Sequence, residues 1–309
     1  MQIIMKIFRI TLGVAFVMTA IVIAFLKLSI PVPSLTKLHV VTTIFPLYDF
    51  TKNIGGDKIE VSLLLPPGVE AHSFEPKPND IVRINQSDIF IYTGKFMEPW
   101  AEDIVKGISG RDVVVVNASK DITRIKQIHK HDSIDPHIWL DFDNDKIIIE
   151  NISNAFSEKD PSNASYYQQN AEEYLNKLSL LDIKYKTSLS LCKSNEIVYG
   201  GHYAFGYLAD RYHLQYFAAQ GISPDAEPTA QDLVQLVQQI QKDKIQYVFY
   251  EELSSPKIAE TLAHETNAKL LLLNAAHNIA KQDFESGVSF SSIMEKNLKS
   301  LQIGLGCNN

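Results

Sequence analysis

The chain has 309 residues, of which 45% are hydrophobic and 21% are charged, and its formal net charge is −7. This composition is ordinary for a globular protein whose core forms without many disulfides or a structural metal. The negative charge and the lack of a basic stripe interleaved with aromatic residues argue against nucleic acid as a partner.

The N-terminus has the pattern of an export signal. Lys6 and Arg9 precede an uncharged run from Ile10 to Leu26. A run of about 17 residues lies near the lower limit for crossing a hydrocarbon core of ~30 Å, and no clear A-x-A cleavage site follows it. We therefore expect residues 1–36 to be either a cleaved signal peptide or a retained signal-anchor that contacts the membrane.

The next part of the chain alternates short β-branched runs with helical patterns. In chain order, strands are predicted at His39–Ile44, Ile59–Leu65, Ile89–Tyr92 and Val113–Asn117. Helices are predicted between them at Tyr48–Ile54, Asn79–Gln86 and Pro99–Ile108. This alternation predicts βαβ units and a largely parallel sheet in an N-terminal lobe, which we assign to residues 37–156.

A long helix is predicted from Pro161 to Ser190, where no glycine interrupts the chain. Apolar residues recur there close to the helical period, at Tyr167, Ala171, Tyr174, Leu175, Leu178 and Leu181. Such a helix exceeds the globular mean of ~11–12 residues, so we interpret residues 157–192 as a bridge between two lobes. Two helices with a tight connection are the alternative.

The alternation then resumes in a C-terminal lobe, residues 193–309. Strands are predicted at Glu196–Tyr199, Gln215–Ala218, Tyr247–Tyr250 and Leu270–Leu273. Helices are predicted at His202–Tyr212, Thr229–Asp243, Lys257–Thr266 and Val288–Leu301. The sequence thus predicts an α/β protein with two (β/α) lobes, mainly parallel sheets and one long linking helix.

Two cysteines, Cys192 and Cys307, are the only ones in the sequence. In an exported chain an isolated pair favours a disulfide, with two free buried thiols as the alternative. Metal ligation by this pair is disfavoured because neither belongs to a C-x-x-C pattern.

Three of the nine histidines stand out by their surroundings. His72 follows a predicted strand, His137 follows Asp135-Pro136, and His202 lies between a strand and a helix after two glycines. Open α/β sheets bind ligands at the carboxyl ends of their strands, so three loops could converge there. Three imidazoles suit Zn²⁺, Cu²⁺ or Ni²⁺ better than Mg²⁺ or Ca²⁺.

The stretches around His72, His137 and His202 resemble the metal-ligand motifs of a known family, the periplasmic zinc/manganese solute-binding proteins of bacterial metal ABC transporters. The resemblance rests on residues 68–76, 135–141, 201–208, 221–228 and 249–253, and it runs in order from about His39 to Leu301. It implies two lobes joined by a rigid helix, with one metal ion bound in the cleft by His72, His137 and His202.

The resemblance also implies a role and partners. Manganese members usually carry a carboxylate where this chain has His202, so Zn²⁺ is expected, with Mn²⁺ or Fe²⁺ as the alternative. We expect a monomer, periplasmic or otherwise extracytoplasmic, that delivers the ion to a membrane permease with its ATPase. A short histidine segment, His129 to His131, is either a solvated loop or a weak metal-capturing one.

The sequence leaves the identity of the fourth metal ligand undecided. The family often supplies Asp or Glu from the second lobe, but the matching position in this chain is Asn274. Water is therefore our first choice, followed by an Asn274 carbonyl contact or a glutamate, Glu70 or Glu252, as ligand or as a partner of a ligand. His277 is the least favoured candidate.

Two other function classes, an enzyme and an adhesin, are alternatives to metal delivery. A His₃ zinc site with an open position is also the layout of a hydrolase or lyase, and Glu70 or Glu75 could then act as the base. The sequence has no H-E-x-x-H, G-x-S-x-G or phosphate-loop motif, so no enzyme activity is expected. A surface adhesin that also binds metal is a third reading.

Overall fold

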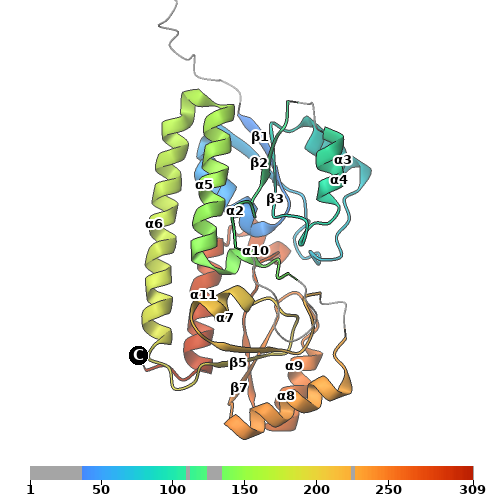
Figure 1. Cartoon of the computed structure of the whole chain (residues 1–309), viewed down its shortest axis with the longest axis vertical. Helices are drawn as coiled ribbons and strands as arrows, with labels where there is room; N and C mark the ends of the chain where they lie inside the picture. The colour runs from blue at the N-terminus through green and yellow to red at the C-terminus, as the bar shows by residue number, and fades with distance from the viewer. Residues whose placement is uncertain (1–36, 109–111, 124–133, 224–226, 309) are drawn as a thin grey trace, which may run out of the picture. The chain divides into compact units, whose positions relative to one another are not determined.

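The computed structural model describes residues 37–108, 112–123, 134–223 and 227–308. Within these residues the chain forms two four-stranded sheets with all pairs parallel, in the orders β2-β1-β3-β4 and β6-β5-β7-β8 (Figure 1). The first sheet is built from β1 (Leu38–Thr42), β2 (Ile59–Leu63), β3 (Ile89–Tyr92) and β4 (Val114–Asn117). The second is built from β5 (Glu196–Tyr199), β6 (Gln215–Ala218), β7 (Tyr247–Tyr250) and β8 (Lys269–Leu272). The predicted fold class is confirmed.

Helices cover both faces of each sheet because successive strand residues point to opposite sides. In β1, Val40 packs into a central core, whereas Val41 packs with α3 (Pro78–Gln86) and α4 (Ala101–Ile108). In β5, Val198 packs in the same way with α8 (Ala230–Asp243) and α9 (Lys257–Thr266). The remaining helical elements of the described chain are α2 (Phe45–Gly55), η1 (Gly56–Lys58), η2 (Ile138–Leu140), η3 (Pro161–Asn163), α7 (Gly206–Arg211), α10 (Lys281–Glu285) and α11 (Phe290–Gly304).

The predicted long helix is α6 (Ala164–Leu189), 26 residues in one piece. A second long helix, α5 (Phe142–Lys159), runs beside it and was not predicted (Figure 1). Asp141 caps α5 by accepting a hydrogen bond from the Asp143 N–H, and the helix buries Ile148, Ile149 and Ile152. Isoleucine has modest helix propensity, so packing against neighbouring elements decides this segment.

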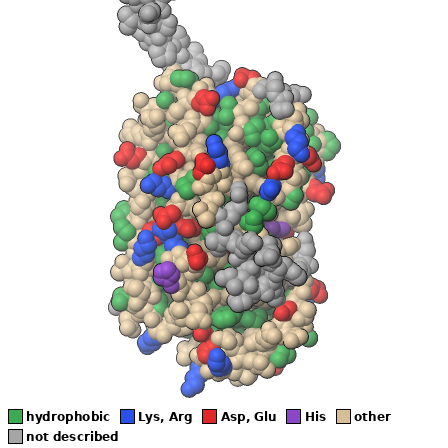
Figure 2. Space-filling model, in the orientation of Figure 1, with side chains coloured by type: hydrophobic (Ala, Val, Ile, Leu, Met, Phe, Trp, Pro, Cys, Tyr) green, Lys and Arg blue, Asp and Glu red, His purple; other side chains and the backbone are tan. Residues whose placement is uncertain are grey.

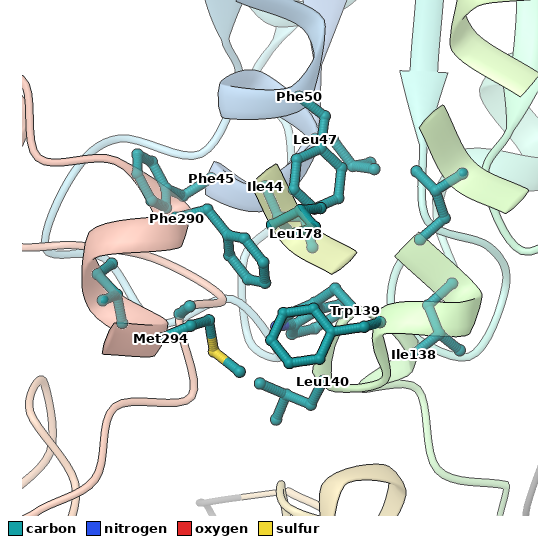
Figure 3. Packing of buried hydrophobic residues seen from close by; sticks show 14 of the residues in the cluster. Ile44, Phe45, Leu47, Phe50, Ile138, Trp139, Leu140, Leu178, Phe290 and Met294 are labelled. Atoms are coloured by element: carbon teal, nitrogen blue, oxygen red, sulfur yellow. The ribbon is translucent and has the colours of Figure 1, made fainter. Parts of the chain in front are cut away.

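The two sheets share one continuous core. It contains residues of the first sheet, such as Val40, and of the second sheet, such as Tyr199, together with side chains of α2, α5, α6 and α11. Figure 3 shows Phe50, Trp139, Leu178 and Phe290 meeting in this core from four different helices. Each such buried side chain contributes roughly 1.5–3 kcal/mol, so this packing holds the two sheets in a defined relation.

Cys192, after α6, and Cys307, after α11, form a disulfide with their sulfur atoms 1.92 Å apart. The bond ties the end of the long helix to the end of the last one. Two predicted features, the N-terminal segment 1–36 and the histidine segment 129–131, lie outside the described residues. Among the helices that are described, none combines the length and apolarity needed to cross a membrane.

Candidate metal centre

The three predicted histidines lie at ends of secondary-structure elements that face one another. His72 is in the loop between β2 and α3, His137 directly precedes η2, and His202 is in the loop after β5. The predicted helix at His202–Tyr212 begins only at Gly206, because the Tyr203 N–H donates to the Gly221 carbonyl instead of entering a helix. His202 is therefore free to face the first sheet from a loop.

The structure brings the three imidazoles together. The Nε2 atom of His137 lies 3.2 Å from the Nε2 atom of His72 and 3.2 Å from the Nε2 atom of His202. One nitrogen from each ring falls within 4.8 Å of the others. Nitrogen ligands at ~2.0–2.1 Å from a tetrahedral metal ion are about 3.3 Å apart, so the observed spacing is that of a coordination shell.

His137 is held by a buried carboxylate. Its side chain has no solvent exposure, and its Nδ1 atom lies 2.7 Å from the Oδ1 atom of Asp135, which also accepts the His137 backbone N–H. Burial lowers the pKa of His137 well below its ordinary value, and the neighbouring imidazoles lower it further. Burial likewise raises the pKa of Asp135. Both shifts favour a neutral His137 ring, which is the form that binds metal.

His202 is held in the same way by Glu251, which directly follows β7. The His202 Nδ1 atom lies 2.9 Å from the Glu251 Oε2 atom, and both side chains are buried. Burial raises the pKa of Glu251, but His202, His277 and Ser254 together lower it by more, so the net shift is downward. Gly201 permits this contact, because a Cβ atom there would lie 2.9 Å from the same carboxylate oxygen.

His72 is partly buried and is the most accessible of the three. Its backbone N–H donates to the Oε1 atom of Glu70 at 3.0 Å. Burial lowers the pKa of the His72 ring well below the ordinary value, and His202 and His277 add to the shift. On the face shown in Figure 2, histidine side chains reach the surface in small separate patches.

The carboxylates also decide which nitrogen faces inward. A carboxylate that accepts the Nδ1–H of an imidazole leaves its Nε2 atom with a lone pair. Asp135 does this for His137 and Glu251 does it for His202, so two lone pairs point at each other over 3.2 Å. A cation between them turns this repulsion into coordination, and imidazole nitrogens select zinc, copper or nickel over magnesium or calcium.

Of the residues predicted beside the triad, one lies there and two lie elsewhere. Glu70 is adjacent through His72, and its Oε2 atom lies 3.9 Å from the His277 Nε2 atom. Glu252 and Asn274 instead line a separate cavity with Asp283 and Lys296. The Asn274 Oδ1 atom accepts the Ala276 N–H at 2.7 Å, so this amide shapes its own loop.

Glu251, which was not predicted as a site residue, and His277, the least favoured candidate, lie beside the triad instead. Glu251, and not its neighbour Glu252, faces the triad, because adjacent residues at a strand end point in opposite directions. His277, the least favoured candidate, lies within 4.8 Å of the ligand atoms of His202 and Glu251. The sequence signal for both was present as polar residues that follow β7 and β8 at the same sheet edge.

Comparison with known proteins agrees with this geometry. The sequence profile of a family described as zinc-uptake complex component A, periplasmic, matches residues 40–304. The high-affinity zinc uptake system protein ZnuA of Bacillus subtilis is 37% identical over 281 residues, 87% of this chain and 88% of the relative.

Two further proteins are similar to this chain in sequence or structure. The zinc-binding lipoprotein AdcA of Streptococcus pneumoniae is 34% identical over 86% of this chain, which spans 55% of the relative's length. The Zn(II)-bound ZnuA-like domain of AdcA superposes with a TM-score of 0.77 at 35% identity, over 87% of this chain and 99% of that domain. The laminin-binding protein Lmb of Streptococcus agalactiae, described as having adhesin and metal transporting activity, gives a TM-score of 0.76 at 29% identity, over 87% and 99%.

Proposed function

Because the chain belongs to the family of periplasmic zinc-uptake components, we propose that it binds one Zn²⁺ ion outside the cytoplasm and delivers it to the permease of an ABC importer. The observation that carries this proposal is the convergence of the Nε2 atoms of His72, His137 and His202. Zinc is the cargo, and Mn²⁺ or Fe²⁺ is the alternative cargo.

The domain organisation that we propose follows the same role. Residues 1–36 export the chain or anchor it to the membrane, residues 37–156 and 193–309 form the two lobes, and residues 157–192 link them. The continuous core that includes both sheets supports a small relative motion of the lobes. A site of this kind takes up and releases the ion by local adjustment of the loops that carry His72 and His202.

Each group in the site has a defined part in the proposed capture. His72, His137 and His202 supply neutral nitrogen ligands, and burial keeps two of them, His72 and His137, from being protonated at neutral pH. Asp135 and Glu251 hold the rings of His137 and His202 in the productive tautomer. The accessible edge at His72 is the side from which the ion enters and leaves.

Zinc titration of the purified chain tests the proposal. We expect one Zn²⁺ per chain, with binding lost in His137→Ala and kept in His264→Ala, which removes an exposed histidine of α9. Calorimetry combined with elemental analysis measures both the stoichiometry and the affinity. A chain that takes up no zinc, or a His137→Ala variant that binds like the original, would refute the assignment.

A further inference from the structure

His277, in the loop after β8, is buried without any hydrogen-bond partner for its ring. Its exposure is 3%, and neither Nδ1 nor Nε2 has a partner in the described part of the chain. A buried imidazole without partners loses its hydration and gains nothing in return, so such groups are rare in folded proteins. A buried ring of this kind, close to the ligand atoms of His202 and Glu251, is a candidate metal ligand.

The ring stands at the edge of the histidine triad. Its centroid lies 5.6 Å from the ring centroid of His202 and 6.1 Å from that of His72. Its Nε2 atom is 3.9 Å from a Glu70 oxygen and 4.0 Å from a Glu251 oxygen, which is beyond hydrogen-bond distance in both cases. His277 therefore lies beside two carboxylates and two of the triad imidazoles and is bonded to none of them.

Hydrogen bonds from η2 and from the start of α2 fix the backbone around His277. The Trp139 indole N–H donates to the Ala275 carbonyl at 2.8 Å, and the His277 carbonyl accepts from the Phe45 N–H at 3.3 Å. Ala276 adopts φ = 60°, a conformation that non-glycine residues rarely take. The loop is thus held in an unfavourable conformation that directs the following imidazole toward the triad.

We propose that His277 is the fourth ligand of the bound zinc ion, so that four imidazoles enclose it. This inference rests on the proposed function and deepens it. In the proposed site one ring nitrogen of His277 would bind the ion instead of facing the carboxylates of Glu70 and Glu251. Glu251 stays on His202, and Glu70 and Glu251 together offset the charge of the dication.

Two consequences follow from a shell of four imidazoles. All four tetrahedral positions are then filled by protein, so no position is left for the activated water of a zinc hydrolase. An all-nitrogen shell also disfavours Mn²⁺, which prefers carboxylate and carbonyl oxygen. Both consequences match a carrier that must hold zinc without reacting.

X-ray absorption of the zinc-loaded chain tests the proposal directly. We expect four nitrogen neighbours with the outer-shell scattering of four imidazoles, and three imidazoles plus one oxygen in His277→Ala. Zinc affinity should fall at least ~10-fold in His277→Ala, since even residues that only orient a ligand cost 10–100-fold. With Co²⁺ as the probe, the visible spectrum of the original chain should be tetrahedral and should change in the variant.

Three imidazoles and one oxygen in the original chain would overturn the proposal, whether or not the variant folds. So would unchanged affinity and an unchanged Co²⁺ spectrum in His277→Ala. The matched control His264→Ala should behave like the original chain. Loss of zinc in His137→Ala with no effect of His277→Ala would leave the proposed function intact and remove only the fourth ligand, whereas absence of zinc binding in the original chain would remove both.

Discussion

The Nδ1 atom of His202 lies 2.9 Å from the Oε2 atom of Glu251, although 49 residues separate the two in the sequence. Both side chains are buried, and the net pKa shift of Glu251 is downward, so an ionised carboxylate accepts the imidazole N–H. This pair turns the His202 Nε2 atom toward His137 and makes Glu251 a positioning residue of the site.

Glu251→Gln should therefore weaken zinc binding without abolishing it. The amide keeps the shape but can present its NH₂ group to the ring, and it loses the negative charge that holds the Nδ1–H of His202. We expect a 10–100-fold lower affinity, the usual cost of such a change, measured by competition with a zinc chelator. Glu260→Gln, on the exposed side of α9, is the matched control and should bind like the original chain. Equal affinities in the two variants would show that Glu251 does not orient the ligand.

His202→Asp should shift the metal preference toward manganese. The substitution replaces a nitrogen donor by a carboxylate oxygen, which zinc tolerates less well and Mn²⁺ prefers. We expect zinc affinity to fall at least ~10-fold. The zinc-to-manganese affinity ratio should fall by a larger factor, because manganese affinity rises. Competition titrations with both metals measure this ratio, and an unaltered ratio would contradict the ligand role of His202.

The pH dependence of binding follows from the lowered pKa values of His72 and His137. Burial is the main cause of both shifts, so protons compete for these nitrogens only below the ordinary histidine pKa of about 6.5. Zinc affinity should stay nearly constant from about pH 8 through about 6.5, because His72 and His137 take up protons only well below that pH. Titrations at a series of pH values check this, and a steep loss of affinity that already begins at about pH 6.5 would show that these two rings are ordinary, solvated imidazoles.

The same shifts affect the metal-free protein in a defined direction. Between the lowered folded pKa and about 6.5, the unfolded chain binds more protons than the folded chain. The contribution of His72 and His137 to the free energy of unfolding is therefore complete above this window and is lost as the pH falls through it.

Loss of the disulfide should lower stability but leave the metal site intact. Cys192 and Cys307 close a loop with a sequence separation of 115 residues, and neither belongs to the candidate metal-ligand groups of the described residues. Substitution of both by serine should reduce the free energy of unfolding by about 2–5 kcal/mol, with unchanged zinc stoichiometry. Urea denaturation of the variant and of the original chain measures the difference, and coincident unfolding curves would show that the bond does not stabilise the fold.

The strands and the three histidines could be predicted from the sequence because their signals are local. Runs such as Ile89–Tyr92 are β-branched and aromatic, and the strand-end positions of His72 and His202 follow from the strands before them. Helix α5 was missed because its stability depends on packing with α6, which no local pattern reports.

The partners of the ligands could not be predicted for a different reason. Glu251 and Glu252 are adjacent and chemically identical, and only the alternation of side-chain direction at the end of β7 decides which one faces the site. Asn274 and His277 share one loop, and its path depends on Ala276 at φ = 60° and on the hydrogen bond that Trp139 of η2 donates to the Ala275 carbonyl. The spacing of residues in the sequence does not report these side-chain directions and this loop path.

Anomalous diffraction from crystals of the zinc-loaded chain is the most direct test of the central claim. We predict a single zinc peak ~2.0–2.1 Å from the Nε2 atoms of His72, His137 and His202 together. A zinc peak bound elsewhere, or a site in which any of these three nitrogens lies out of coordination range, would contradict it.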